Sequence, residues 1–159
     1  MTDTIEHSQV HSTFVIERSY PAPLADVWHA LTDTDARAHW FGGGDAFDVS
    51  EQSHEFRVGG RAVEDGRWKD GPASRFEAVY TDIVDQHRAV FTYDMWIDGG
   101  HLSTSLTTIV VEPEGSGTRL TYTEQAVYFD GLDKGGDREA GCRELLENLG
   151  RYLDERLTA

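Results

Sequence analysis

One carboxylate in this sequence is placed where it could act on a bound molecule. Residues two apart share a face of a β-strand, so Leu120, Tyr122, Glu124 and Ala126 point to the same side of a predicted strand. In a dry cavity with aromatic neighbours, Glu124 could orient a ligand or serve as an acid or base. The alternative is a glutamate near the strand end that reaches water or pairs with an arginine, since most glutamates are exposed.

A second strand supplies further candidates. Phe91, Tyr93, Met95 and Ile97 share one face, whereas Asp94 lies on the other and is the second acid or base candidate. If the apolar faces point inward, the polar tips inside belong to Tyr93, Tyr122 and Glu124. The residues predicted to bind a ligand are Trp40, Phe41, Trp68, Tyr80, Tyr93, Met95, Tyr122, Glu124 and Cys142.

The tryptophans divide into core and rim positions. Trp28 lies on the apolar face of a predicted helix and is expected in the core, because large aromatic residues serve packing first. Trp40 and Phe41 precede three glycines and are expected at the rim of a pocket. Trp68, in the charged segment 65–70, is either a lid residue or a partly exposed anchor.

Other site chemistries lack their motifs. The seven histidines form no i, i+4 pair on a predicted helix and no cluster with cysteine, so we predict no metal site and no cofactor. Cys142 is expected to be a small buried hydrophobe and not a nucleophile. No Gly-x-Ser-x-Gly motif occurs, and Gly42-Gly43-Gly44 lacks the Lys and Ser/Thr of a phosphate loop.

Composition limits the partners. The chain has 159 residues, enough for one domain with a real core, and a net charge of −15. That charge argues against nucleic acid and anionic membrane surfaces as partners. A single cysteine allows no internal disulfide, and no signal peptide or long apolar run appears, so a cytoplasmic location is expected.

The pattern along the chain predicts an α+β domain. Residues 1–11 are expected to form a flexible tail and residues 12–159 a single domain, beginning with a strand at Thr13–Tyr20. Pro23 can open a helix, and Thr32 or Asp33 can cap a second one ending near Phe41. Short turns then separate six strands, which must form an antiparallel meander. They are predicted at Asp45–Ser50, Phe56–Val63, Phe76–Val84, Ala89–Ile97, Leu102–Val111 and Thr118–Val127.

A final helix starting near Asp137 is predicted to cover the sheet. Its apolar stripe comprises Cys142, Leu145, Leu146, Leu149, Tyr152, Leu153 and Leu157. Gly141 and Gly150 inside it each cost about 0.5–1 kcal/mol relative to Ala, which indicates close backbone approach or a fault line beside a cavity.

A series of motifs in the family's order resembles the activator-of-Hsp90-ATPase homologue (AHSA1-like) family of the START and Bet v 1-like superfamily. They begin with Ala22-Pro23, Val27-Trp28, Ala30-Leu31 and Trp40, and continue through residues 56–61, 76–93 and 117–125. The resemblance spans about residues 12–157. Many relatives carry Gly-Trp where this chain has Gly141-Cys142, which would enlarge the cavity or let another aromatic side chain fill it.

The resemblance implies a helix-grip fold, a curved antiparallel sheet of six to seven strands wrapped around a long C-terminal helix. It also implies a cavity for a small hydrophobic or aromatic molecule, and a binding protein without catalysis is the first hypothesis. The second is a cofactor-independent cyclase, dehydratase or hydrolase using Glu124 or Asp94. The third is a partner-binding module, dimeric or linked to Hsp90, although the co-chaperone activity belongs to larger relatives with an additional domain.

Overall fold

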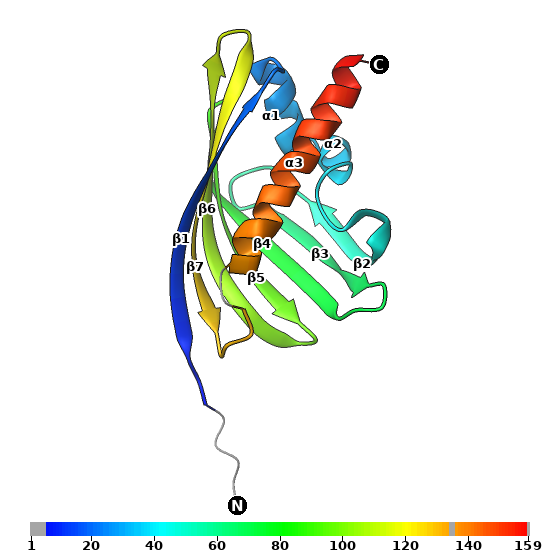
Figure 1. Cartoon of the computed structure of the whole chain (residues 1–159), viewed down its shortest axis with the longest axis vertical. Coiled ribbons are helices and arrows are strands. Elements are labelled where there is room, and N and C mark those ends of the chain that lie inside the picture. Colours follow the sequence, from blue (N-terminus) through cyan, green and yellow to red (C-terminus); the bar gives the residue numbers. More distant parts are fainter. Residues whose placement is uncertain (1–5, 134–135, 159) are drawn as a thin grey trace, which may run out of the picture.

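The computed structural model describes residues 6–133 and 136–158 and forms a curved sheet that grips one long helix (Figure 1). The sheet has seven strands in the order β1-β7-β6-β5-β4-β3-β2, and every neighbouring pair is antiparallel. The strands are β1 (Gln9–Tyr20), β2 (Phe47–His54), β3 (Arg61–Trp68), β4 (Ala73–Val84), β5 (Arg88–Ile97), β6 (Gly100–Glu114) and β7 (Gly117–Phe129). The predicted antiparallel helix-grip architecture is therefore confirmed.

Two short helices follow β1 at one end of the sheet, α1 (Leu24–Thr32) and α2 (Thr34–Ala38), with a single 3-10 turn, η1 (Gly44–Ala46), after them. Pro23 occupies the N-cap of α1, and the Asp33 carboxylate caps α2 by accepting from the Ala36 N–H at 3.0 Å. Two separate caps break the segment into two helices, as predicted. Trp40 and Phe41 follow α2 instead of ending it.

The C-terminal helix, α3 (Gly136–Thr158), crosses the concave face of the sheet (Figure 1). Its buried side chains recur at helical spacing, and Leu149 and Leu153 are almost fully buried. The predicted stripe is too long by its last member, because Leu157 is 48% exposed in the final turn. Tyr20 reaches α3 through a 2.8 Å hydrogen bond from its hydroxyl to the Leu146 carbonyl.

The two interior glycines of α3 have different surroundings. A Cβ on Gly150 would lie 3.2 Å from the Tyr20 ring, so this glycine permits close packing of α3 on β1. A Cβ on Gly141 would meet nothing within 4 Å, and this residue lines the cavity described below. Close backbone approach thus explains Gly150, whereas Gly141 lies beside the cavity.

The predicted boundaries of the first strands were wrong. β1 begins at Gln9, so residues 9–11 of the expected tail pair with β7, because the long β7 offers backbone partners as far as Phe129. Residues 51–54 and 64–68, left between the predicted strands as turns, lie inside β2 and β3, and the turn between β2 and β3 contains Gly59, whose φ is +81°. Gly66 lies within β3, and glycine is needed there because a Cβ would lie 2.2 Å from the Asp48 carbonyl oxygen.

Candidate functional site

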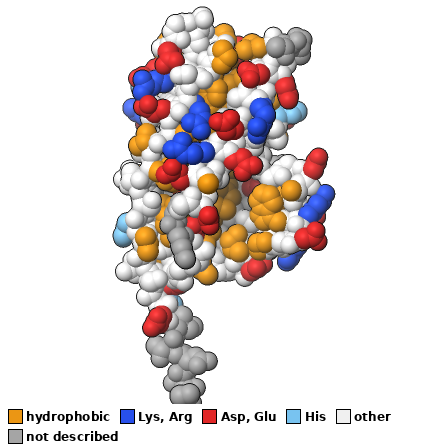
Figure 2. Space-filling view, viewed as in Figure 1, with side chains coloured by type: hydrophobic (Ala, Val, Ile, Leu, Met, Phe, Trp, Pro, Cys, Tyr) orange, Lys and Arg blue, Asp and Glu red, His pale blue; other side chains and the backbone are white. Residues whose placement is uncertain are grey.

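A cavity of about 850 Å³ lies between the concave face of the sheet and α3. Figure 2 shows hydrophobic side chains gathered in a hollow beside the charged outer surface of α3. Sheet alternation places the lining, because β4 and β5 turn every second side chain toward α3. Six rings stand in an unbroken series with centroids 5.0–6.0 Å apart, Phe41, Phe76, Tyr93, Phe91, Tyr80 and Phe56.

One border of the cavity is built by the segment after α2. The Trp40 indole N–H donates to the Ala30 carbonyl at 2.9 Å, which fixes this ring beside Phe41. Trp68 at the end of β3 packs on Phe47 with ring centroids 5.0 Å apart. A Cβ on Gly43 would lie 2.5 Å from the Trp68 ring, so glycine is required where this loop passes under the indole.

A fully buried carboxylate lies behind the lining on β7. Glu124 Oε1 accepts hydrogen bonds from the hydroxyls of Tyr93 at 2.7 Å and Tyr122 at 2.8 Å, with Thr107 Oγ1 at 3.3 Å. Glu124 Oε2 is buried and has no hydrogen-bond partner among the described residues. The carboxylate thus holds the two tyrosine hydroxyls that face the cavity.

Arg138 in the first turn of α3 faces this carboxylate from the other side. Its Nη1 lies 3.6 Å from Glu124 Oε2 and donates to the Tyr93 hydroxyl at 3.0 Å. Its Nη2 donates to Ser103 Oγ at 2.8 Å and lies 3.6 Å from an Asp133 carboxylate oxygen. A buried cation therefore connects α3 to β5, β6 and β7.

Burial sets the protonation states in this network. Burial, followed by the nearby Glu124, raises the pKa of Tyr93 well above its usual value, and burial does the same for Tyr122. Burial, followed by Glu124, raises the pKa of the Cys142 thiol to about 12. Burial alone would lower the pKa of Arg138, but Tyr93 and Glu124 more than offset it and the net shift is upward. At neutral pH the phenols and the thiol are donors and Arg138 is a cation.

A second polar group borders the cavity, with Arg37 of α2 and Glu64 of β3 in the lining and His54 of β2 bonded to the lining residue Tyr80. The Arg37 guanidinium lies over the Phe41 ring, 3.6 Å from its centroid. His54 Nε2 is 2.8 Å from the Tyr80 hydroxyl. Burial and then Arg37 lower the pKa of His54 to about 4, so this imidazole is neutral at pH 7. Glu64 is also buried, and its Oε2 accepts from Gln52 Nε2 at 2.9 Å.

The protein-family model described as activator of Hsp90 ATPase homolog 1-like protein matches residues 21–157. This chain belongs to that family. The comparison with curated proteins finds no match.

Several solved structures are similar to this AHSA1-like protein. A Rhizobium loti protein is 46% identical with a TM-score of 0.85, covering 92% of this chain and 99% of its own. A Rhizobium leguminosarum protein is 34% identical with a TM-score of 0.89, covering 94% and 99%. An AHSA1-like protein of Aeromonas hydrophila, at 23% identity and a TM-score of 0.70 over 91% and 94% of the two chains, shows the fold alone.

The structure brings together most of the residues selected from the AHSA1-like sequence. The predicted residues that line the cavity are Trp40, Phe41, Trp68, Tyr80, Tyr93, Met95, Tyr122 and Cys142. Glu124 lies directly behind Tyr93 and Tyr122. Trp28 is buried in the core, as predicted.

Asp94 lies outside this group. Strand alternation turns it to the convex face, where it accepts from Thr104 Oγ1 at 2.5 Å and lies 2.9 Å from His101 Nε2. Of the charged segment 65–70, residues 65–68 form the end of β3, and Lys69 and Asp70 form the turn that follows. Trp68 is 39% exposed, lies over Gly43 and packs on Phe47, which is the position of a partly exposed anchor; a lid role stays a prediction.

Three charged residues of the site were missed. Arg37 and Arg138 were not among the predicted site residues, and Glu64 lay just outside the predicted strand Phe56–Val63. Period-two burial of Ala62, Glu64 and Gly66 would have placed Glu64 on the inner face if the hairpin turn had been found first. Arg138 had no signal of its own, because its partners come from distant strands.

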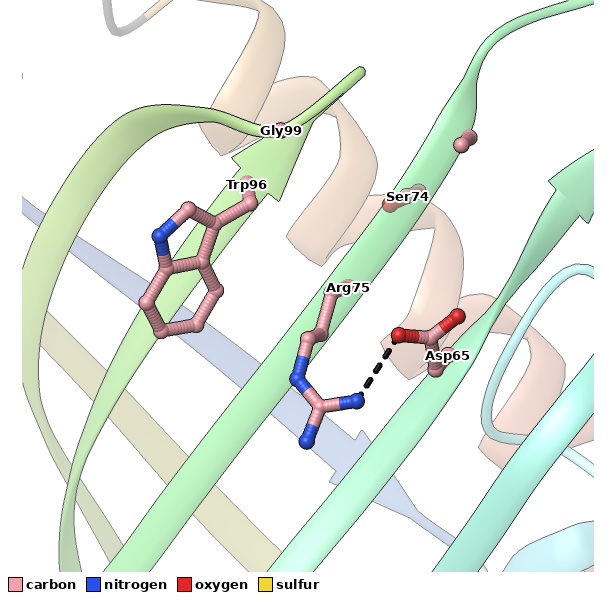
Figure 3. Close-up of a pocket in the computed structure, with 6 residues that line it drawn as sticks. Asp65, Ser74, Arg75, Trp96 and Gly99 are labelled. Carbon is pink, nitrogen blue, oxygen red and sulfur yellow. Dashed lines mark hydrogen bonds and ion pairs between the residues drawn. The ribbon is translucent and has the colours of Figure 1, made fainter.

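The convex face carries a smaller depression of about 260 Å³ (Figure 3). Trp96 and Arg75 stand on its floor with Asp65, and Arg75 Nη1 donates to the Asp65 carboxylate at 2.8 Å. Further ion pairs tie Arg75 to Glu51 and Glu77. Because Arg75 is already paired with three carboxylates of the same sheet, we interpret this depression as a network of surface ion pairs and not as a second candidate site.

In the described part of the chain, no group of three or more His, Cys, Asp or Glu side chains is arranged to hold a metal ion. No helix within residues 6–133 and 136–158 is long and apolar enough to cross a membrane.

Proposed function

We propose that this AHSA1-like protein binds a small hydrophobic or aromatic molecule in the cavity between the sheet and α3. The observation that carries the proposal is the series of six aromatic rings along a cavity of about 850 Å³. Ligand sites in proteins are cavities of about 300–1,000 Å³ lined by apolar and aromatic side chains with a few placed polar groups. The cavity has this size and this lining.

The arrangement around Glu124 favours binding over acid–base chemistry at this residue. Two tyrosine hydroxyls occupy Oε1, and Oε2, which makes no hydrogen bond among the described residues, is buried 3.6 Å from Arg138 Nη1. A general acid or base needs hydrogen-bond access to its substrate. Glu124 is fully buried behind the lining, so its role in the proposal is to position Tyr93 and Tyr122.

The expectations about cellular location and about binding partners stay predictions. They are the cytoplasmic location, a homodimer, a link to Hsp90, and the exclusion of nucleic acid and membranes by the net charge of −15. The binding proposal depends on none of them.

Fluorescence titration with N-phenyl-1-naphthylamine, a neutral probe that brightens in apolar surroundings, tests the proposal. Ala78 and Val79 are neighbours in β4 that face opposite sides, the buried Ala78 lining the cavity and Val79 being 40% exposed. We expect Ala78→Phe to abolish saturable probe binding by filling the cavity, and Val79→Phe to leave it unchanged. Met95→Trp is a second cavity-filling variant should Ala78→Phe fail to fold. Equal binding by all these variants would refute the proposal.

A further inference from the structure

One cation in the cavity wall has no acceptor from the protein. Among residues 6–133 and 136–158, no hydrogen bond or ion pair reaches the Arg37 guanidinium. Arg138, the other arginine of the lining, is engaged by a tyrosine, two serines and two carboxylates. The five N–H donors of Arg37 are thus available to a molecule in the cavity.

The guanidinium is held in place by its stacking on Phe41. Its central carbon lies 3.6 Å from the ring centroid, and Phe41 is itself packed against Phe76. Stacking fixes the plane of the donor fork without using its N–H groups. A planar anion such as a carboxylate can accept two parallel hydrogen bonds from such a fork.

The buried carboxylate of the same cavity wall does not pair with Arg37. Glu64 lines the same cavity, yet the two side chains form no ion pair within 4.0 Å. Its Oε2 is occupied by Gln52, and its Oε1 lies against Gly42, where a Cβ would come within 2.6 Å. Burial is the main cause that lowers the pKa of Arg37, with Tyr80 and Glu64 acting the other way. An unpaired, partly desolvated cation gains from an anionic partner.

We propose that the cavity binds an amphipathic organic anion, an aromatic carboxylate or sulfonate, whose anionic group pairs with Arg37 while its rings lie along the aromatic lining. This inference rests on the proposed function and adds the chemical class of the ligand. Glu64 disfavours a second negative charge at the same end of the cavity and can accept from an N–H or O–H next to the anionic group.

Two fluorescent probes that differ by one sulfonate test this inference. N-phenyl-1-naphthylamine is neutral, and 8-anilinonaphthalene-1-sulfonate carries the same rings with an anionic group. In Arg37→Met the unbranched thioether keeps contact with the Phe41 ring but removes the cation. We expect the dissociation constant of the sulfonate probe to rise about 10- to 100-fold, as for loss of a charged hydrogen bond, and that of the neutral probe to stay within about twofold.

Matched variants separate local pairing from net charge and from folding. Arg57→Gln removes an exposed arginine that is paired with Glu55 and does not line the cavity, and it should leave both probes unchanged. Arg37→Lys should recover part of the sulfonate affinity because it restores the charge without the planar fork. Neutral-probe binding by Arg37→Met shows that the variant is folded.

The outcomes distinguish the two proposals. If the natural protein binds neither probe, the proposed function is refuted and the anion inference with it. If the neutral probe binds but Arg37→Met changes the two affinities equally, or changes neither, the anion inference alone is overturned.

Discussion

Replacing Glu124 with Gln should destabilise the protein far more than its conservative shape suggests. Gln keeps an acceptor for the hydroxyls of Tyr93 and Tyr122, which lie 2.7 and 2.8 Å from Glu124 Oε1. It removes the negative charge 3.6 Å from Arg138 Nη1, and with the amide oxygen kept on the tyrosines its NH2 group faces that cation. Breaking a buried charge pair by changing one partner costs about 3–5 kcal/mol.

Urea unfolding followed by circular dichroism measures this loss. For a chain of this size about 1 kcal/mol corresponds to 2–4 °C in the melting temperature, so Glu124→Gln should melt at least ~6 °C lower. The exposed pair of Glu17 and Arg119 has N and O atoms 2.6 Å apart and supplies the control. Glu17→Gln should cost less than about 1 kcal/mol, because surface ion pairs contribute little.

A double-mutant cycle then isolates the interaction across the cavity wall. Arg138→Met alone should also destabilise, since it leaves Glu124 buried without its cation, and the double variant should lose less than the sum of the two. We expect a coupling of at least about 1 kcal/mol. Additive losses, or a loss below about 1 kcal/mol for Glu124→Gln, would refute the account of this network.

Three further predictions concern individual residues. The pKa of His54 is about 4 in the fold and about 6.5 when unfolded, so the unfolded state binds more protons between these values and stability should fall as pH drops from 6.5 to 4. In urea unfolding, the free energy of unfolding of the natural protein minus that of His54→Gln should be about 1–2 kcal/mol higher at pH 7 than at pH 5, and parallel pH profiles would contradict this. The Cys142 thiol, buried with a pKa of about 12, should resist iodoacetamide at pH 8 and react in urea; rapid native labelling would contradict its burial. Gly141→Ala should stabilise by about 0.5–1 kcal/mol, whereas Gly150→Ala should gain less because its Cβ meets the Tyr20 ring; equal gains in thermal melts would show that Tyr20 does not limit this position.

Local patterns predicted the parts of the fold that depend on neighbours in sequence. The cap at Asp33, the alternation that turns Tyr93 and Met95 inward, and the apolar stripe of α3 all depend on period and local chemistry. The β2–β3 hairpin was misplaced because Gly66 was taken for a turn residue. Its absent side chain instead allows the backbone of Asp48 to pass, a contact that no local signal encodes.

The residues of the candidate site likewise divide into those that a local pattern predicts and those that it does not. Aromatic members such as Tyr93 and Tyr122 could be selected because the strand period places them on apolar faces. Arg37 and Arg138 could not, because an arginine in a helix has the same local pattern whether it faces water or a cavity. Only the folded arrangement shows that Arg138 meets Glu124 whereas Arg37 meets no acceptor in the described residues.

The position of a bound molecule tests the central claim most directly. Nuclear Overhauser effects between bound N-phenyl-1-naphthylamine and ¹³C-labelled methyl groups report which side chains touch the probe. The account predicts effects to the methyl groups of Met95 and Leu146, which line the cavity, and none to Val79 on the convex face. Effects to Val79 without any to Met95 or Leu146 would contradict it.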